Sequence, residues 1–442
     1  MNNTGEQIYD FLEEIFPICR SIMGDGNRET LAAIQKHIPI KVHEVPTGYQ
    51  AYDWEIPKEW KIRDAYVLDP AGQKVIDFKE SNLHVVNYSI PVDKEMDLSE
   101  LQEHLYSIPE KPDAIPYVTS YYDQKWGFCL THDQRQEMPP GKYKVHIDSE
   151  HKDGSLSYGE LIIPGESNEE IFLTSYICHP SMANNECSGP AVLTFLAKWL
   201  CGRKNRYTYR IVFAPETIGA IVYISKNFNS LRKNTIAGFN LTCIGDDREY
   251  SYMPSRLGNT LADKVIEHVL QNHTDTHTKH SFLYKGSDER QYCHPRVDLP
   301  LVSIMRSKYG TYPEYHTSKD DLNLVSPAGL EGGYAVARKC IEALELNHKY
   351  ENLIICEPKM SKRDLRPKDW HKRRTNSNDN MRKNVRDLMN VMFYCDGFHD
   401  LIDLSNKIEL SFDKCYECVK LLEENEIIRK IDAPACETDY DH

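Results

Sequence analysis

The sequence lacks an apolar run long enough to cross a membrane. A spanning helix needs about 20 consecutive apolar residues, and charged side chains make up 27% of this 442-residue chain. The first residues, Met-Asn-Asn-Thr-Gly-Glu-Gln, have neither the basic start nor the apolar centre of a signal peptide. We therefore expect a cytoplasmic protein without a membrane partner.

Basic charge is also scarce. The chain has 53 lysines and arginines against 67 aspartates and glutamates, which gives a net charge of −14 at pH 7. Proteins that bind nucleic acids do so largely through basic contacts to phosphates. The composition therefore argues against a nucleic-acid partner.

The thirteen cysteines do not form a recognisable disulfide or zinc-ribbon pattern. Their number is odd, and the only CxxC pair, Cys415 and Cys418, has no second pair nearby, although a structural zinc site needs one. Cys178, Cys243 and Cys340 lie inside apolar segments, where cysteine behaves as a small hydrophobic residue. Reduced thiols are the expectation.

The length predicts two or three domains. Helical spacing appears over residues 5–21 and 28–37, and a β-rich module with hairpins at 65–78 and 142–163 follows. Strands and helices then alternate from 169 to 346, with strands near 170–177, 209–214, 238–244 and 299–305. We predict an α/β fold with a mixed, mostly parallel sheet flanked by helices, formed by residues 1–44 and 151–355 and interrupted by an inserted β-rich domain at 45–150.

The C-terminal residues predict a different domain. A basic, polar stretch at 356–383 is interpreted as a linker, and residues 384–442 give three helices and a short strand, the order of a winged helix. The helix that would enter the DNA groove carries Asp413, Glu417, Glu423 and Glu424, a poor surface for phosphates. We expect this domain or the inserted domain to mediate interactions, with a homo-oligomer as one form.

A candidate metal site lies at the ends of the predicted strands. His179 closes the run from Glu170, Glu186 follows it by seven residues, and Glu216 and His316 come after later strands. Ligands of open α/β sheets bind outside the carboxyl ends of the strands, and His and carboxylate side chains are zinc ligands. Each residue also has a simpler explanation, as a buried structural histidine, a helix N-terminal carboxylate or an exposed loop residue.

The region 169–345 resembles the zinc-dependent aminopeptidases, which include relatives of the bacterial leucyl aminopeptidases and of the glutaminyl cyclases. The matching stretches are Cys178-His179, Ala183–Gly189, Pro215–Gly219, Leu241–Gly245 and Tyr315–Thr317. The whole chain is similar to bacterial aminopeptidase-like proteins that have an inserted domain of unknown function and a C-terminal winged helix. Shared features are Trp54–Trp60, Cys178–Glu186, Gly286–Gln291 and Tyr312–Thr317.

The resemblance implies one zinc ion per chain rather than two. The family's bridging aspartate falls on Asn185, and two further carboxylate ligands fall on Thr217 and Thr242. The set that remains is His179, Glu186 and His316 as ligands and Glu216 as the catalytic base, which is enough for a catalytic zinc. Asn185 and Asp246 stay open as alternative ligands.

The loop Gly286–Gln291 aligns with the family's substrate side. Asp288 could receive an α-amino group and Arg290 a carboxylate, although a helix cap and a surface ion pair would explain them equally well. The leading hypothesis is a zinc hydrolase of the aminopeptidase type that cleaves an amide of a small peptide or aminoacylated metabolite. The alternatives are an acyl or cyclising transferase on the same site, and a non-catalytic scaffold or regulator.

Overall fold

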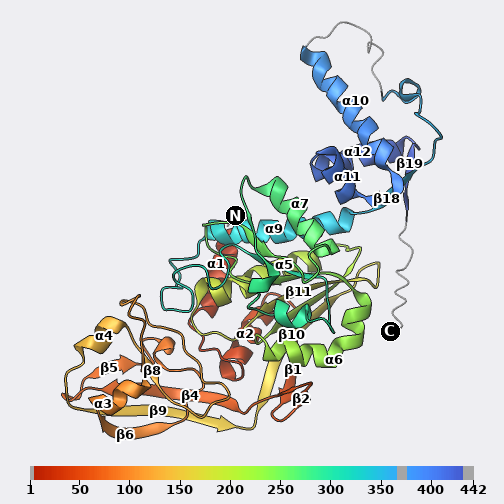
Figure 1. Ribbon diagram of the computed structural model, residues 1–442. Coiled ribbons are helices and arrows are strands. Elements are labelled where there is room, and N and C mark those ends of the chain that lie inside the picture. The colour runs from red at the N-terminus through yellow and green to blue at the C-terminus, as the bar shows by residue number, and fades with distance from the viewer. Residues whose placement is uncertain (1–3, 366–375, 432–442) are drawn as a thin grey trace. The chain divides into compact units, whose positions relative to one another are not determined.

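The computed structural model describes residues 4–365 and 376–431, with the side chains of 376–382 left out (Figure 1). The chain divides into two compact units, Met1–Asp263 with Thr276–Arg338, and Lys264–Asp275 with Lys339–His442. Within the described ranges, no helix combines the length and apolarity that crossing a membrane requires.

The first unit is built on a mixed sheet, in which the described residues form eight strands. The strand order is β1 (Lys41–Pro46), β10 (Ser155–Ile163), β12 (Thr208–Ala214), β11 (Glu170–Tyr176), β13 (Thr235–Leu241), β16 (Leu301–Met305), β14 (Ser251–Met253) and β15 (Thr278–Lys279). The four central strands from β12 to β16 are parallel, and β10 and β14 run antiparallel to them. The predicted fold class is confirmed.

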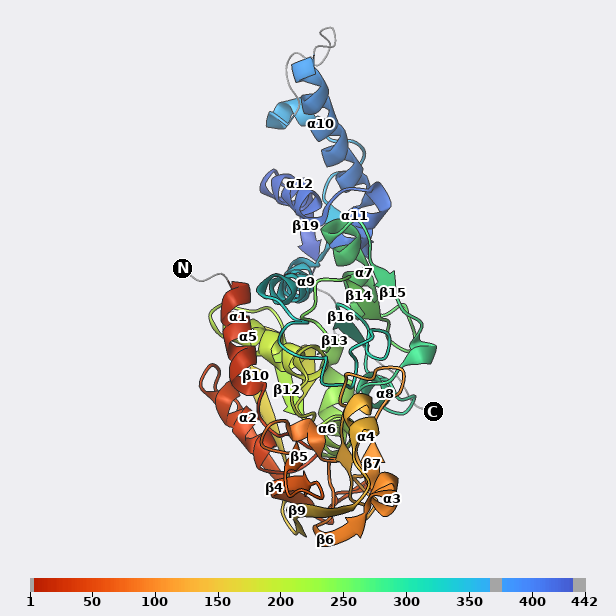
Figure 2. The same cartoon turned by 90° about the vertical axis from the view of Figure 1, so that its left-hand side faces the viewer.

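Two crossovers in opposite directions open a crevice in this sheet. Helix α5 (Ser188–Cys201) connects β11 to β12, and helix α6 (Ile218–Asn234) leads back past β11 to β13. Because such crossovers are right-handed, helices from opposite directions lie on opposite faces, as the two ribbon views show (Figures 1 and 2). Ligands bind where the direction reverses, which is at the carboxyl ends of β11 and β12.

Two N-terminal helices complete this sheet domain. Helix α1 (Thr4–Ile15) buries Ile8, Phe11 and Leu12 and packs on α5, and helix α2 (Asp25–Gln35) packs on β10 (Figure 2). The helix predicted over 5–21 ends at Ile15, because Pro17 disfavours helical geometry at the residue before it. Helix α8 (Glu289–Tyr292) also belongs to the first unit, whereas α7 (Leu261–His273) and α9 (Pro327–Leu346) begin in the first unit and end in the second.

The inserted domain has its own antiparallel sheet. Its strands run in the order β5 (Lys74–Asp77), β4 (Glu59–Leu68), β9 (Lys142–Lys152) and β6 (Val92–Asp97). The short elements around it are β2 (Gln50–Ala51), β3 (Trp54–Glu55), α3 (Leu98–Leu101), β7 (Leu105–Tyr106), β8 (Phe128–Cys129) and α4 (His132–Glu137). The predicted hairpin at 65–78 is confirmed by the pairing of β4 with β5.

The hairpin predicted at 142–163 is wrong. Strand β9 pairs with β4 and β6 in the inserted sheet, whereas β10 pairs with β1 and β12 in the main sheet. The two residues Asp153 and Gly154 therefore join two different sheets. Local turn chemistry indicated a reversal correctly, but it carries no information on which strand becomes the partner.

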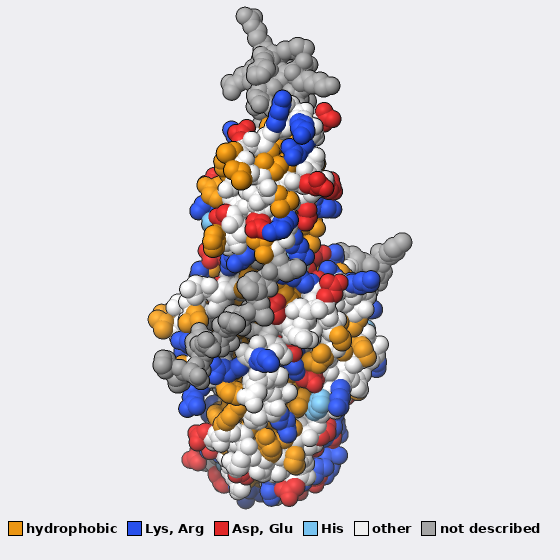
Figure 3. Space-filling view, turned by 90° about the vertical axis from the view of Figure 1, so that its right-hand side faces the viewer, with side chains coloured by type: hydrophobic (Ala, Val, Ile, Leu, Met, Phe, Trp, Pro, Cys, Tyr) orange, Lys and Arg blue, Asp and Glu red, His pale blue; other side chains and the backbone are white. Residues whose placement is uncertain are grey.

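The second unit places three helices against a small sheet. The helices are α10 (Asn376–Tyr394), α11 (Leu401–Ile408) and α12 (Phe412–Glu424), and the strand order is β18 (Asp396–Asp400), β17 (Lys349–Asn352) and β19 (Ile428–Ile431). Its core includes Leu388, Val391, Leu401 and Val419. Acidic and basic side chains are intermixed over the part of this unit that faces the viewer in Figure 3.

The predicted linker, 356–383, lies within this unit, after β17. Residues 366–375 lie outside the described residues, a 3-10 turn occupies Met360–Arg363, and α10 begins at Asn376. Strand β17 precedes the predicted linker, yet it pairs with β18 and β19. Strand β18 could not be predicted, because Asp-Gly-Phe-His-Asp is poor in strand-forming residues.

Candidate functional site

The candidate site lies at the carboxyl ends of β11 and β12, where the crossover direction reverses. His179 follows β11 and Glu216 follows β12, and these strands are parallel neighbours. The Nε2 atom of His179 lies 4.0 Å from Oε2 of Glu216. The side chain of His179 is 6% exposed and that of Glu216 is 21% exposed, so both meet at a shielded position that still opens to a cavity.

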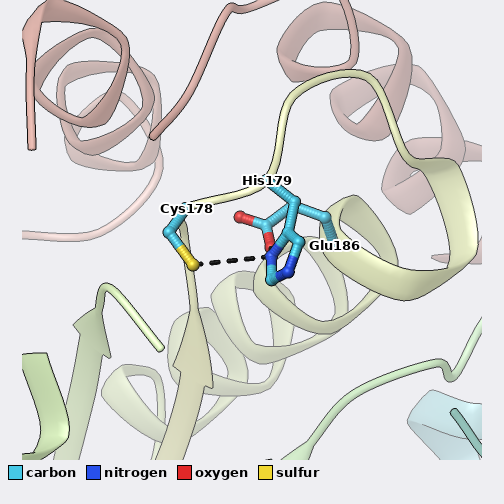
Figure 4. Close-up of side chains that lie close together, drawn as sticks. All are labelled: Cys178, His179 and Glu186. Atoms are coloured by element: carbon cyan, nitrogen blue, oxygen red, sulfur yellow. Dashed lines mark hydrogen bonds and ion pairs between the residues drawn. The ribbon is translucent and has the colours of Figure 1, made fainter. Parts of the chain in front are cut away.

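Glu186 fixes the orientation of His179. Its Oε2 lies 2.8 Å from Nδ1 of His179, and Figure 4 shows the carboxylate beside the imidazole. Burial alone would disfavour the charged ring, but this hydrogen bond and the charges of Glu186 and Glu216 raise the pKa of His179 above its usual value. With Nδ1 occupied by Glu186, Nε2 is the atom directed at Glu216. A carboxylate that holds the second nitrogen is the usual partner of a metal-binding histidine.

A buried arginine from the N-terminal segment supports this pair. Arg20 is 1% exposed, and its Nε atom lies 3.6 Å from Oε1 of Glu186. Its N–H groups also donate to the carbonyl oxygens of His179 (2.8 Å) and Ile15, to the Thr30 hydroxyl (3.4 Å) and to the Cys187 sulfur (3.0 Å). The guanidinium therefore neutralises Glu186 and anchors the backbone at His179. Nothing in the sequence pattern marked this residue.

His316 enters from a loop after β16. Its ring centroid lies 5.3 Å from that of His179, and it stacks on Tyr315 at 3.9 Å. Burial and the neighbouring His179 lower the pKa of His316 to about 3, so the ring is neutral. Its Nε2 is buried and has no hydrogen-bond partner among the described residues. A neutral, unpaired imidazole nitrogen is a free metal ligand.

Glu216 is held at a strained turn. Thr217 has φ 63° and ψ −76°, and Ile218 N–H donates to the Glu216 carbonyl oxygen at 2.7 Å. A non-glycine residue in such a conformation costs about 1–3 kcal/mol and persists where its surroundings enforce it. Here Thr217 N–H donates to Asp288 Oδ1 at 2.7 Å, and Arg290 Nη2 donates to the Thr217 hydroxyl at 2.7 Å. The turn is thus fixed from two sides.

Burial raises the pKa of Glu216 above the usual glutamate value, against the opposing effect of the charges of His179 and Arg290. A raised pKa is what a general base that works near neutral pH requires.

The two predicted substrate contacts, Arg290 and Asp288, differ in their access to the cavity. Arg290 lines the cavity beside Glu216. Asp288 is 1% exposed and lies outside that lining, and burial together with the charge of Glu216 raises its pKa well above the usual range. Asp288 is therefore a buried hydrogen-bond acceptor behind the Glu216 turn.

The two alternative metal ligands, Asp246 and Asn185, differ in their hydrogen bonding. Asp246 is 1% exposed and accepts hydrogen bonds from Asn184, Arg248 and Ser307, so its oxygens are engaged away from the cavity. Asn185 is different, because its Oδ1 is buried without a partner among the described residues while its amide nitrogen donates to the Tyr176 hydroxyl.

The histidines, Glu216 and Arg290 open onto one cavity of about 320 Å³. One wall comes from the α/β domain: Ile22, Cys178, His179, Glu216, Thr217, Ile218, Arg290 and His316. The other wall comes from the inserted domain: Trp54, Tyr117, Thr119, Tyr121 and Tyr122. No motif in the sequence indicated that the insertion contributes to the site. The tyrosine-rich run after Pro116 was the one available signal.

Both sides of the His179 imidazole have neighbouring groups of the kinds that bind zinc. The sulfur of Cys178, a ring nitrogen of His179 and a carboxylate oxygen of Glu186 lie within 4.8 Å of one another (Figure 4). On the other side of the same imidazole, Nε2 of His179 faces the cavity together with His316 and Glu216. Thiolate, imidazole and carboxylate are the groups that bind zinc in proteins.

The fold, with this site at its switch point, defines an aminopeptidase-like α/β protein. The crystal structure of a zinc aminopeptidase from Bacillus subtilis superimposes with a TM-score of 0.56 at 12% identity, over 77% of this chain and 94% of that one. At that identity the likeness establishes the fold alone.

Comparison with protein families then places the chain. Residues 9–347 match a family described as a domain of unknown function, DUF4910, and residues 348–430 match a winged helix-turn-helix model. The chain therefore belongs to the DUF4910 family and carries a winged helix. The resemblance drawn from the sequence is confirmed.

Two relatives come from Clostridium acetobutylicum. One, provisionally named as a polysaccharide biosynthesis protein with an aminopeptidase-like domain, is 48% identical over 365 residues, which cover 82% of this chain and 84% of that protein. The other is a crystal structure provisionally named as a peptidase, with a TM-score of 0.90 and 43% identity over 97% of both chains.

Proposed function

We propose that this protein is a zinc-dependent hydrolase of the aminopeptidase type that cleaves an amide bond in a small metabolite or peptide. The observation that carries the proposal is the meeting of His179, His316 and Glu216 at one cavity, with the unpaired Nε2 of His316 directed into a buried setting. The aminopeptidase-like fold of the family supports the reaction class.

His179 and His316 would hold the metal through their Nε2 atoms, because Glu186 occupies Nδ1 of His179. Asn185 would complete the set through its Oδ1, which is buried and has no hydrogen-bond partner within the described residues. Oε1 of Glu186 likewise has no hydrogen-bond partner there, but this carboxylate lies on the Nδ1 side of His179 and 3.6 Å from Nε of Arg20. This assignment favours the first of the two neighbouring positions that the sequence left open. One ion per chain is the expected content.

A bound zinc ion would polarise the amide carbonyl and acidify a water molecule. Glu216 accepts the proton of that water and returns it to the leaving nitrogen, a role that its raised pKa suits. Asp288 and Arg290 keep Glu216 in place through Thr217. Arg290 also presents guanidinium N–H groups to an anionic or carbonyl group of the substrate.

A non-catalytic role is the second candidate, and one observation favours it. Thr217 and Thr242, at two positions where the aminopeptidases have carboxylate ligands, are satisfied by the protein: Thr217 accepts from Arg290, and the Thr242 hydroxyl lies 2.5 Å from that of Tyr176. Neither residue supplies a carboxylate for a second metal, and these contacts do not involve His316.

The test is elemental analysis of the purified full chain, combined with hydrolysis assays on leucinamide and leucyl-glycine. About one zinc per chain, lost in His316→Ala and kept in Glu216→Gln, supports the proposal when hydrolysis disappears in both. Product analysis identifies a transferase, which would release a cyclic or transferred acyl product instead of a free acid. No zinc after reconstitution would refute the catalytic proposal.

A further inference from the structure

The inserted domain lies directly over the candidate site. Pro116 forms a β-bridge with Thr317, Tyr117 N–H donates to the His316 carbonyl oxygen at 2.9 Å, and Ser318 N–H donates to the Ile115 carbonyl oxygen at 2.8 Å. The Tyr117 ring lies 5.2 Å from the rings of both His179 and His316. The inserted chain is therefore tied to the loop of a proposed ligand and forms part of the same cavity.

The side chains on this wall are aromatic and hydroxylated. Tyr117 and Tyr121 join their hydroxyls at 2.7 Å, and Thr119 lies between them in sequence. Across the cavity, Thr217 and Arg290 add a hydroxyl and a guanidinium. The aliphatic residues of the lining are Ile22 and Ile218 alone, among the residues that the structure describes. Four of the five residues that the inserted domain contributes to the lining are aromatic.

Two aromatic rings at this wall remain open to solvent. Trp54 is 38% exposed and Tyr122 is 54% exposed, and they meet edge to face with ring centroids 5.9 Å apart. In an edge-to-face contact, one ring contributes only its edge. Both faces of that ring are therefore not covered by the other ring. Aromatic faces are electron-rich and attract the C–H groups of a sugar ring, which adjacent oxygens make slightly positive.

We propose that the cavity accepts an N-acylated amino sugar, with the pyranose ring against Trp54 and Tyr122 and the acyl amide directed at Glu216. Aromatic faces bind the C–H side of such a ring, and the tyrosine, threonine and arginine groups bind its hydroxyls. The volume, about 320 Å³, lies at the lower end of ligand pockets, which suits one ring with its substituents. This inference rests on the proposed amide hydrolysis and names its substrate class.

The reaction balances with water alone. The amide C–N bond breaks, the oxygen of water joins the acyl carbon to give a carboxylic acid, and the nitrogen leaves as the free amine of the sugar with a proton returned by Glu216. The reaction requires no oxidant, reductant or second substrate.

The test measures binding separately from turnover. N-acetyl-D-glucosamine and leucinamide are titrated into the full-length Glu216→Gln protein, which should bind without hydrolysis, and binding is followed by saturation-transfer NMR. We expect the sugar to bind and Trp54→Ala to weaken it roughly ten-fold. Tyr52→Asn is the matched control: Tyr52 is 61% exposed in the same hairpin and outside the cavity lining, and its φ of 57° suits asparagine.

Absence of sugar binding, or equal sugar binding by the Trp54→Ala protein, would overturn the inference, as would saturation by leucinamide with none by the sugar. Wild-type hydrolysis of leucinamide together with no sugar binding would remove the inference and leave the proposed function standing. Sugar binding that depends on Trp54, without hydrolysis by the zinc-loaded wild type, would support the substrate class and refute the proposed reaction.

Discussion

Replacing Arg20 with methionine should destabilise the first unit more than any loss of a surface charge could. Methionine has a similar length and no charge, so the change removes the guanidinium while filling much of its space. Arg20 is 1% exposed, and its Nε lies 3.6 Å from the Glu186 carboxylate, which is also 1% exposed. The variant therefore leaves a buried carboxylate with His179 as its remaining neighbour of opposite charge.

The expected loss is about 3–5 kcal/mol, the range for removing one member of a buried ion pair. The carbonyl oxygens of His179 and Ile15 also lose a donor, and a buried acceptor left unpaired costs about 1–3 kcal/mol. These terms overlap, since part of the space can relax. We therefore predict that Arg20→Met lowers the free energy of unfolding by an amount in the upper half of the range of about 3–5 kcal/mol.

Urea unfolding followed by tryptophan fluorescence is the assay. Four of the five tryptophans, Trp54, Trp60, Trp126 and Trp199, belong to the first unit, and Trp370 lies outside the described residues. The fluorescence therefore reports mainly the unit that contains Arg20, which matters because a chain of two units need not unfold in one step.

A double-mutant cycle separates charge from packing. Glu186→Gln removes the charge and keeps the shape, so the combined Arg20→Met and Glu186→Gln protein should be more stable than the sum of the single losses predicts, by at least about 1 kcal/mol. Additive losses, or a loss below about 1 kcal/mol for Arg20→Met alone, would refute the buried pair. Zinc affinity should also fall about 10–100-fold in Glu186→Gln, because the carboxylate orients His179.

Three further outcomes are expected. Glu216→Gln should lower kcat about 10²–10⁴-fold without loss of zinc, as stopped assays and elemental analysis would reveal; retained activity would remove Glu216 as the base. Because burial raises the pKa of Glu216 and the base works ionised, kcat/KM should rise with pH through a midpoint above the usual glutamate value of about 4.3; a midpoint at or below that value would contradict this. Asp288→Leu should lower the free energy of unfolding by about 1–3 kcal/mol, since Thr217 N–H loses its acceptor, and should also lower kcat. Asp288→Asn should retain most of the stability and most of kcat. Equal kcat losses in the two variants would argue against a positioning role.

The positions of His179 and Glu216 could be predicted from the sequence for a physical reason. Both follow apolar runs, and a buried parallel strand shows itself as such a run. Neighbouring parallel strands bring their carboxyl ends to the same edge of the sheet, so two residues 37 positions apart in the chain lie 4.0 Å apart at their side-chain tips.

Arg20 and the inserted wall could not be predicted in the same way. Arg20 lies in a loop between two helices, and its burial depends on how that loop packs against the end of β11. Tyr117 reaches the site because its strand-like segment pairs with the chain at Thr317, two hundred residues later. Pairings at that separation leave no periodic signal, for the same reason that the turn at Asp153 revealed no partner for β10.

The charge around the site argues for one metal rather than two. Two zinc ions bring four positive charges, and the aminopeptidase pattern meets them with several carboxylates. Here Thr217 and Thr242 carry no charge and are bonded within the protein, and the charge of Glu186 is already met by Arg20. Glu216 remains as the carboxylate that faces the cavity, among the described lining residues. One divalent ion held by the imidazoles of His179 and His316, with Glu216 free to take a proton, is the arrangement that leaves the fewest buried charges uncompensated.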